Sequence, residues 1–158
     1  MIFCLVARIL RVFFVPTNVG VKMHFKLVEN PNDIHAVIYK VARVVYAQTH
    51  AASLRLVEAM TSMIANAALK SNRTVADIVS DQNMFDALNP SSTRHAYMSV
   101  DVNNAGFKMC LRTALRMVNG ILPDMCSGAT RFHNADVLPD WAISIGYIAE
   151  VDDVLFYL

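Results

Sequence analysis

Few side chains in this sequence could take part in acid–base or nucleophilic chemistry, and they are scattered along the chain. Glu58 stands just inside an apolar helical stretch, where desolvation would favour the protonated form that an acid catalyst needs. Cys126 and His133 could form a nucleophile and a base, but no oxyanion-stabilising or orienting group accompanies them. His133 and Asp136 resemble a fragment of a metal site, yet no third ligand follows at a recognisable spacing. We therefore expect no metal and no cofactor.

Length and composition indicate one folded domain. The chain has 158 residues, of which 55% are apolar and 17% charged, so it is long and apolar enough to bury a core. The formal net charge is only +1, and neither a glycine-rich phosphate loop nor a nucleic-acid motif is present. We expect no nucleic-acid partner. Cys110 falls on an apolar helical stripe and is expected in the core, with reduced thiols as the main interpretation and one Cys110–Cys126 disulfide left open.

Residues 1–29 form an apolar N-terminal segment of uncertain role, ahead of the domain at 30–158. Residues 1–15 are very apolar, but Arg8 and Arg11 interrupt them too late in the segment for a signal peptide. The run is also too short to cross a bilayer, so no transmembrane span is expected. We interpret the segment as a leader or first element that packs on the domain, or as preceding a true start at Met23. An interfacial amphipathic segment is the alternative.

Three helices are predicted in the first two thirds of the domain. The first begins at Asn30-Pro31 and carries apolar residues at helical spacing up to position 45, and the pattern breaks over residues 46–52. Ser53 can cap a second helix that is apolar almost all round and therefore central and buried. The third long helix opens at Asp101 or Asn103 and stops at Gly120.

Between the second and third helices, Thr74 and Asp77 predict a short capped helix, and residues 89–92 predict a turn. The last third changes its pattern. Residues 130–133 alternate like a strand, residues 137–141 form a proline-containing loop, and residues 154–157 are predicted to be an edge or closing strand. The fold class expected is α+β, mainly helical with a short C-terminal β-rich portion.

Several stretches, in order, resemble the motifs of the SleB-type cell wall hydrolases. The clearest are GATRFHN at 128–134, LPDW at 138–141 and FY at 156–157, which resemble the family pattern "GA-x-x-(Y/F)-H", "P-x-W" and "F-Y". Upstream, residues 84–90, 110–124 and 57–66 are similar to further family segments. The resemblance implies a lysozyme-like fold that acts on the glycan strands of peptidoglycan, and hence a place in the cell envelope, although no clear export signal is visible.

The resemblance also implies one catalytic glutamate, which serves as acid and then as base. The family segment "Y-G-E-x-R-G-E" corresponds to residues 46–52, so the catalytic position is Gln48 and the second glutamate is Ala52. Alanines also replace both glycines, at Ala47 and Ala51. A primary amide can donate a hydrogen bond but cannot deliver a proton to a leaving alkoxide. We therefore expect impaired catalysis.

The candidate site residues follow from these matches. Gln48 is the degenerate catalytic position, with a polar surface residue as the alternative, and Glu58 is a substitute acid or a structural residue. Five residues are candidates for contact with sugar, each with a structural role as the alternative: Tyr46, His133, Asn134, Trp141 and Tyr157.

Three functions stay open at this point. The chain could be a working glycosidase that uses Glu58, a degenerate domain that binds glycan or a partner without cleaving, or an interaction module that retains only the hydrolase fold. The expected partner in the first two cases is peptidoglycan. The sequence does not indicate an oligomeric state.

Overall fold

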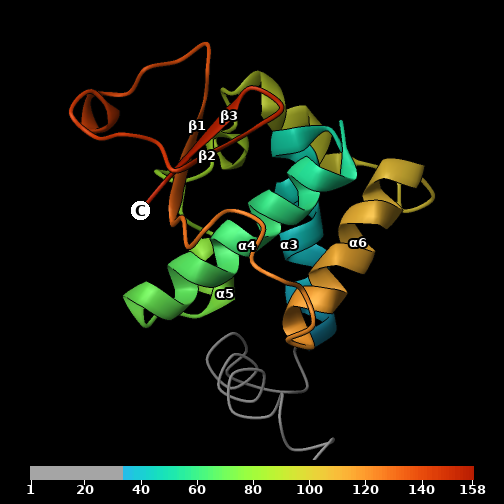
Figure 1. The fold of residues 1–158 in the computed structure, drawn as a ribbon. Coiled ribbons are helices and arrows are strands. Elements are labelled where there is room, and N and C mark those ends of the chain that lie inside the picture. The colour runs from blue at the N-terminus through green and yellow to red at the C-terminus, as the bar shows by residue number, and fades with distance from the viewer. Residues whose placement is uncertain (1–33) are drawn as a thin grey trace, which may run out of the picture.

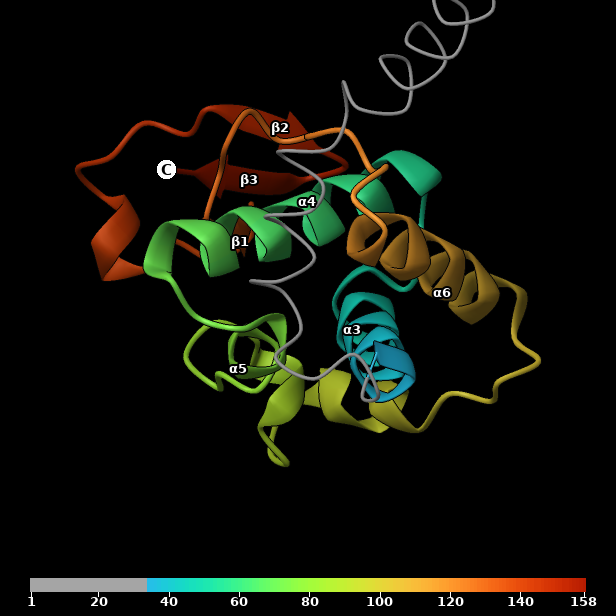
Figure 2. The same cartoon turned by 90° about the horizontal axis from the view of Figure 1, so that it is seen from below.

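The helix that is apolar on nearly every side, α4 (Leu54–Ser71), lies at the centre of the fold. The computed structural model describes residues 34–158. In Figure 2, α4 lies between a small sheet on one side and helices α3 (Ile34–Thr49) and α5 (Val75–Ile78) on the other. Eleven of its residues are buried, as expected for a helix without a polar stripe. The predicted central position of this helix is confirmed.

Capping side chains set the helix starts. The Ser53 hydroxyl accepts a hydrogen bond from the Leu56 amide, and Thr74 and Asp77 form a reciprocal capping box, so both predicted caps are confirmed. Helix α6 (Ala105–Val118) begins one residue after Asn104, whose side chain accepts from the Phe107 amide. The predicted openings at Asp101 or Asn103 are therefore wrong.

Helix α6 does not begin at Asp101 because this residue caps a turn that precedes the helix. Its carboxylate accepts a hydrogen bond from the Asn103 amide, and its backbone carbonyl accepts one from the Asn104 amide. At the other end of α6, Gly120 has a φ of 69°, the left-handed conformation that a glycine allows after a helix, so the predicted stop is confirmed.

The first described helix is longer than its apolar pattern indicated, because α3 continues to Thr49 rather than breaking at Tyr46. The Thr49 hydroxyl donates to the Val45 carbonyl, four residues back, which satisfies its polar group inside the last turn. After α5, the chain forms two 3₁₀ helices, η2 (Asp86–Leu88) and η3 (Thr93–Ser99), with the predicted turn between them.

The sheet has three antiparallel strands, β1 (Arg131–Asn134), β2 (Ala149–Val151) and β3 (Val154–Tyr157), in the order β1-β3-β2. Residues 154–157 are predicted to be an edge or closing strand; the edge position is wrong, since β3 is the central strand, whereas β3 does close the sheet as its last strand in sequence. Asp152 and Asp153 join β2 to β3 with φ angles of 47° and 60°, as a two-residue hairpin loop requires. The long connection from β1 to β2 carries the short helix η4 (Asp140–Ala142) and lies on the side of the molecule away from α6 (Figure 1).

The core joins these elements. Its largest fully buried side chains include Phe85, Phe107 and Phe156, and burial of each such ring contributes about 1.5–3 kcal/mol. Cys110 and Cys126 are buried free thiols, which confirms the predicted core role of Cys110 and the reduced state of this pair. The expected mainly helical α+β class is confirmed.

Two predictions concern residues outside the described part of the chain, namely the segment 1–29 and the helix start at Asn30-Pro31. Among the helices of residues 34–158, none is long and apolar enough to cross a membrane.

Candidate functional site

Gln48 lies in the last turn of α3 with only 5% of its surface exposed. The chain reverses directly after it, because His50 and Ala51 adopt φ angles of 50° and 51° before Ser53 caps the next helix. The Ala51 amide donates to the Thr49 hydroxyl at 3.1 Å, which holds this reversal. Gln48 is therefore fixed at the corner between two core helices rather than on a surface loop.

The amide of Gln48 lies between a carboxylate and a guanidinium. The Gln48 Nε2 donates to Asp86 Oδ1 at 2.7 Å. Arg94 Nη1 donates to the backbone carbonyl of Gln48 at 2.7 Å and to the side-chain Oε1 of Gln48 at 3.3 Å. Asp86 Oδ2 accepts from the Ser92 hydroxyl at 3.1 Å and lies 3.6 Å from Arg94 Nε. The donor end of the amide thus faces the anion and its acceptor end faces the cation, which fixes the orientation of the side chain.

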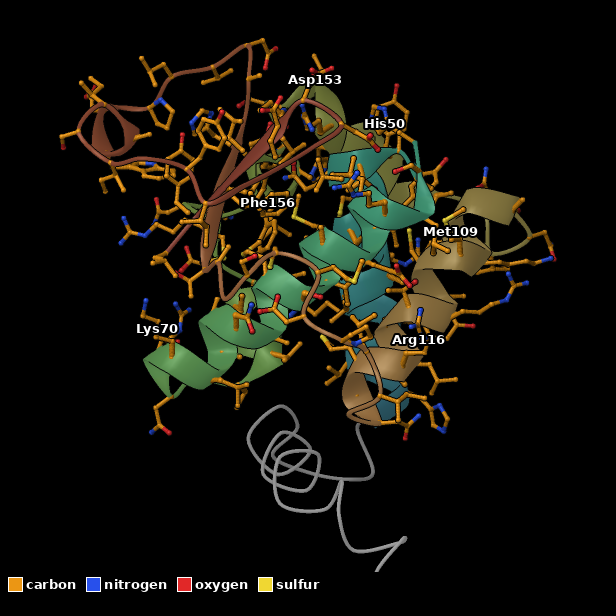
Figure 3. The ribbon with its side chains drawn as sticks, viewed as in Figure 1. His50, Lys70, Met109, Arg116, Asp153 and Phe156 are labelled. Atoms are coloured by element: carbon orange, nitrogen blue, oxygen red, sulfur yellow. The ribbon has the colours of Figure 1, made fainter. Side chains whose placement is uncertain are left out.

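A pocket of about 610 Å³ opens beside this network, and we call it the Gln48 pocket. Its wall combines the end of α3, the start of α4, η3, the residues after β1 and the β2–β3 hairpin. His50 and Asp153, which both line it, lie near one another at the same end of the molecule (Figure 3). The lining residues are Gln48, Thr49, His50, Ala52, Leu56, Arg94, Asn134, Ala135, Asp136, Asp152, Asp153 and Val154.

Carboxylates dominate the charge of the Gln48 pocket. Asp136, Asp152 and Asp153 line it, and the Ser53 hydroxyl donates to Asp152. Desolvation, followed by the positive charge of Arg94, lowers the pKa of His50 below its ordinary value. His50 is therefore neutral at pH 7, and Arg94 supplies the positive charge of the wall. Such a lining offers many acceptors for the hydroxyl groups of a ligand.

Of the candidate site residues, Gln48 and Asn134 meet in this pocket, and Ala52, the position of the second family glutamate, and Asp136 line it as well. Tyr46 does not line this pocket. Its ring lies edge-on to the ring of Phe107, with the two centroids 6.3 Å apart. Trp141, His133 and Tyr157 also lie outside the lining of the Gln48 pocket and instead contact one another.

His133, Tyr157 and Trp141 form an aromatic cluster on the sheet. The His133 Nδ1 lies 2.8 Å from the Asn134 carbonyl, which can only accept, so Nδ1 carries a proton. In the neutral ring, Nε2 then accepts from the Tyr157 hydroxyl at 2.8 Å. The Trp141 ring stands edge-on to Tyr157 at 5.2 Å. Both polar partners of the buried His133 are thus internal, which favours a structural role for this residue.

Replacing Tyr157 with phenylalanine should lower the free energy of unfolding by about 1 kcal/mol, because it leaves a buried ring nitrogen of His133 without its donor. Tyr147→Phe, which removes a hydroxyl from a ring that is 54% exposed, is the matched control and should change stability very little. Urea unfolding of the two variants measures the difference. Equal midpoints would show that the hydroxyl contributes nothing to stability.

Glu58 lies away from the Gln48 pocket and pairs with Arg116 of α6. Its side chain is 14% exposed, while that of Arg116 is 38% exposed. Figure 3 shows Arg116 on the α6 side of the molecule, far along the bundle from His50 and Asp153. The geometry therefore gives Glu58 the role of an ion pair between α4 and α6 rather than that of an acid directed at a ligand in this pocket.

We expect Glu58→Gln to reduce stability by about 1 kcal/mol, since it removes the charge of the largely buried partner of a partly exposed ion pair. Binding in the Gln48 pocket should not change. Glu150→Gln, on the exposed surface of β2, removes the same charge without touching α6 and serves as control. Thermal melts at low and high salt measure both variants. A loss of ligand binding with unchanged stability would contradict the structural role.

The alternative nucleophile, Cys126, is unsuited to that task. Burial, and then the neighbouring Asp124 carboxylate, raise the pKa of its thiol to about 12, so it is protonated at neutral pH. Within residues 34–158, no cluster of three or more histidine, cysteine or carboxylate side chains is arranged to hold a metal ion.

Sequence reasoning missed several residues that shape the site. Asp86 belongs to the stretch 84–90, but nothing in its spacing shows that it contacts Gln48. Arg94 carried no signal at all. Asp152 and Asp153 stand between two apolar runs, and aspartate favours turns, so their composition indicates a turn there but not a pocket wall.

Comparison with protein-family models gives no match to the chain, and comparisons with curated proteins and with solved structures give none either.

Proposed function

We propose that this domain binds the glycan strands of peptidoglycan in the Gln48 pocket, as a SleB-like, lysozyme-like cell wall hydrolase domain whose catalysis is impaired. The observation that supports this most directly is the placement of Gln48. The residue that stands where the resemblance implies a catalytic glutamate is buried against a pocket, at the end of a core helix, with its amide fixed between Asp86 and Arg94.

The size and lining of the pocket support a saccharide ligand. About 610 Å³ lies within the usual range of small-ligand pockets of about 300–1,000 Å³. Asp136, Asp152 and Asp153 provide acceptors for sugar hydroxyls, and the Asn134 side chain provides both a donor and an acceptor. Leu56 and Val154 add apolar surface for the C–H faces of a sugar ring.

The proton supply of the pocket supports impaired catalysis. General acid catalysis contributes about 10²–10⁴-fold to a rate, and the amide of Gln48 cannot provide it. Asp86 is the carboxylate in contact with Gln48, but both its oxygens already accept hydrogen bonds from protein donors. Asp152 likewise accepts from Ser53.

Co-sedimentation with purified, insoluble peptidoglycan tests the binding. We expect the wild-type protein to sediment and Asn134→Ala to bind about two- to tenfold more weakly, the effect of one lost hydrogen bond. Asn103→Ala removes the same side chain from an exposed turn outside the pocket and should bind like the wild type. Failure of the wild-type protein to sediment would overturn the proposed function.

A further inference from the structure

A second pocket, of about 570 Å³, lies at the start of β1, and we call it the Trp141 pocket. Its wall includes the end of α4, the segment after α5 and the first residues of β1. Arg131 and Phe132 of β1 line this pocket, whereas Asn134, at the other end of the same strand, lines the Gln48 pocket. A strand rises by about 3.3 Å per residue, so the two lining positions 131 and 134 are about 10 Å apart along β1.

The Trp141 pocket is as cationic as the Gln48 pocket is anionic. Lys70, Arg73 and Arg131 line it together with a single carboxylate, Asp81. Arg73 is bound to Asp81 at 3.0 Å, so the cations available to a ligand are Lys70 and Arg131, which are both exposed. Within residues 34–158, no carboxylate forms an ion pair with either of them. Figure 3 shows Lys70 at the end of α4, on the side that carries the sheet and away from Arg116.

Aromatic and apolar groups lie beside these charges. The Arg131 guanidinium stands over the Trp141 ring, 5.5 Å from its centroid, which holds the charge at the pocket wall. Phe132, Ile78 and Met84 supply apolar surface to the same space. A ligand that fits this lining carries a carboxylate next to small apolar groups. The guanidinium and ammonium groups bind the carboxylate, and the aromatic rings cover the apolar groups.

We infer that the Trp141 pocket is a subsite for the carboxylates of the peptide stems that branch from peptidoglycan glycan strands. The inference rests on the proposed function, which seats the glycan strand in the Gln48 pocket. A stem attached to a sugar in that pocket reaches Arg131 after about 10 Å along β1. Lys70 lies further away, about 21 Å along α4 from Leu56 of the Gln48 pocket, so it meets the outer part of the stem. The opposite charges of the two pockets then separate a hydroxyl-rich chain from its acidic branches.

The only tryptophan of the chain, Trp141, lines this pocket, so its fluorescence reports occupancy directly. The probe is the free stem peptide released from peptidoglycan by an amidase, and we expect a saturable change in Trp141 fluorescence. The same peptide with its carboxylates converted to methyl esters should give none. Inorganic phosphate tests the other source of negative charge. If phosphate saturates the signal as well as the peptide does, or if the peptide gives no signal, the inference is overturned.

A charge-matched pair of variants assigns the effect to the pocket. Lys70→Gln/Arg131→Gln should bind the stem peptide at least about tenfold more weakly, since each removed group is a charged hydrogen-bond donor. Lys108→Gln/Arg112→Gln removes the same charge from the exposed surface of α6, outside both pockets, and should keep the wild-type affinity. Equal weakening by both double variants would attribute the effect to net charge and overturn the inference.

Sedimentation with intact and with amidase-stripped glycan separates this inference from the proposed function. We expect the wild type to bind intact peptidoglycan more tightly than stripped glycan. The variant Lys70→Gln/Arg131→Gln should bind the two materials equally, with the affinity that the wild type has for stripped glycan. Equal wild-type binding to both would overturn the subsite while the glycan-binding function stands. Wild-type binding to neither would overturn the glycan-binding function, and the fluorescence titration would still decide whether the pocket takes the stem peptide.

Discussion

Gln48→Glu should give the domain measurable glycan-cleaving activity, at least about tenfold above that of the wild type. General acid catalysis can raise a rate by ~10²–10⁴-fold, so this expectation is a part of the full effect. The environment of position 48 favours a protonated acid there. Asp86 Oδ1 now accepts a hydrogen bond from the Gln48 amide at 2.7 Å, and a glutamic acid can replace that donor only if it keeps its proton. Burial of position 48 and repulsion by the Asp86 carboxylate raise the pKa of an introduced glutamate, and the Arg94 guanidinium, 3.3 Å from the present Oε1, opposes them.

The measurement is the release of soluble fragments from purified peptidoglycan as a function of pH. Activity should fall as the pH rises through the pKa of the introduced glutamate, because only its protonated form donates to the leaving oxygen. Adding Asp86→Asn removes the repelling charge and supplies an amide donor in its place, so the falling limb should move to lower pH. Gln48→Ala is the control that has neither amide nor acid.

Two outcomes would contradict this prediction. Cleavage by the wild type at a rate that Gln48→Glu does not exceed would show that another group supplies the proton. A folded Gln48→Glu protein that binds peptidoglycan but releases no fragments would show that the pocket does not position a glycosidic bond beside residue 48.

Gly106→Ala should destabilise the fold by about 1–3 kcal/mol, although alanine is the better helix former. A Cβ at position 106 would lie 2.8 Å from the Ala51 Cβ and 3.2 Å from the Tyr46 ring, so a residue of the α3–α4 turn must move. Ala51 has a φ of 51° and little freedom to do so. Because this turn follows Gln48 directly, we also expect weaker binding in the Gln48 pocket. Urea unfolding measures the free energy.

The matched test is a double-mutant cycle with Ala51→Gly, which removes the opposing methyl group. A glycine also accepts the positive φ of position 51 without strain, which offsets its higher chain entropy in the unfolded state. In the Ala51→Gly background, Gly106→Ala should lower the free energy of unfolding by less than about 1 kcal/mol. The remaining loss comes from the close contact of the new Cβ with the Tyr46 ring. Additivity of the two substitutions within about 0.5 kcal/mol would contradict the proposed contact.

Local chemistry made part of this fold predictable. Ser53 and Thr74 are caps whose partners lie within four residues, so the sequence shows both members of each interaction. The same holds for Gly120, where one residue type accepts the required backbone conformation. The end of α3 was less predictable, because Tyr46 to Thr49 continue the helix through contacts with residues more than thirty positions away, such as the bond from Gln48 to Asp86.

The strand order could not be deduced because an apolar strand has the same pattern at an edge and in the centre. Val154, Phe156 and Tyr157 are buried, which the sequence indicated, but their two hydrogen-bonding neighbours follow from topology. The candidate site shows the same division. Position 48 was singled out by the resemblance of residues 46–52 to a family segment, whereas its partner Arg94 lies 46 residues further along and is brought to it only by the fold.

The central place of β3 sets an order of events when the chain is made. Both β1 and β2 leave the ribosome before the strand to which they pair, so neither can complete its hydrogen bonds until residues 154–157 arrive. Helices α3, α4 and α6 can meanwhile assemble from earlier residues. The pairing of β2 with β3 is local, but β1 pairs with β3 across the long β1–β2 connection, and such long-range pairing is slow compared with local helix formation. Ligand competence should therefore appear as the last kinetic phase of refolding, after most of the helical signal has returned.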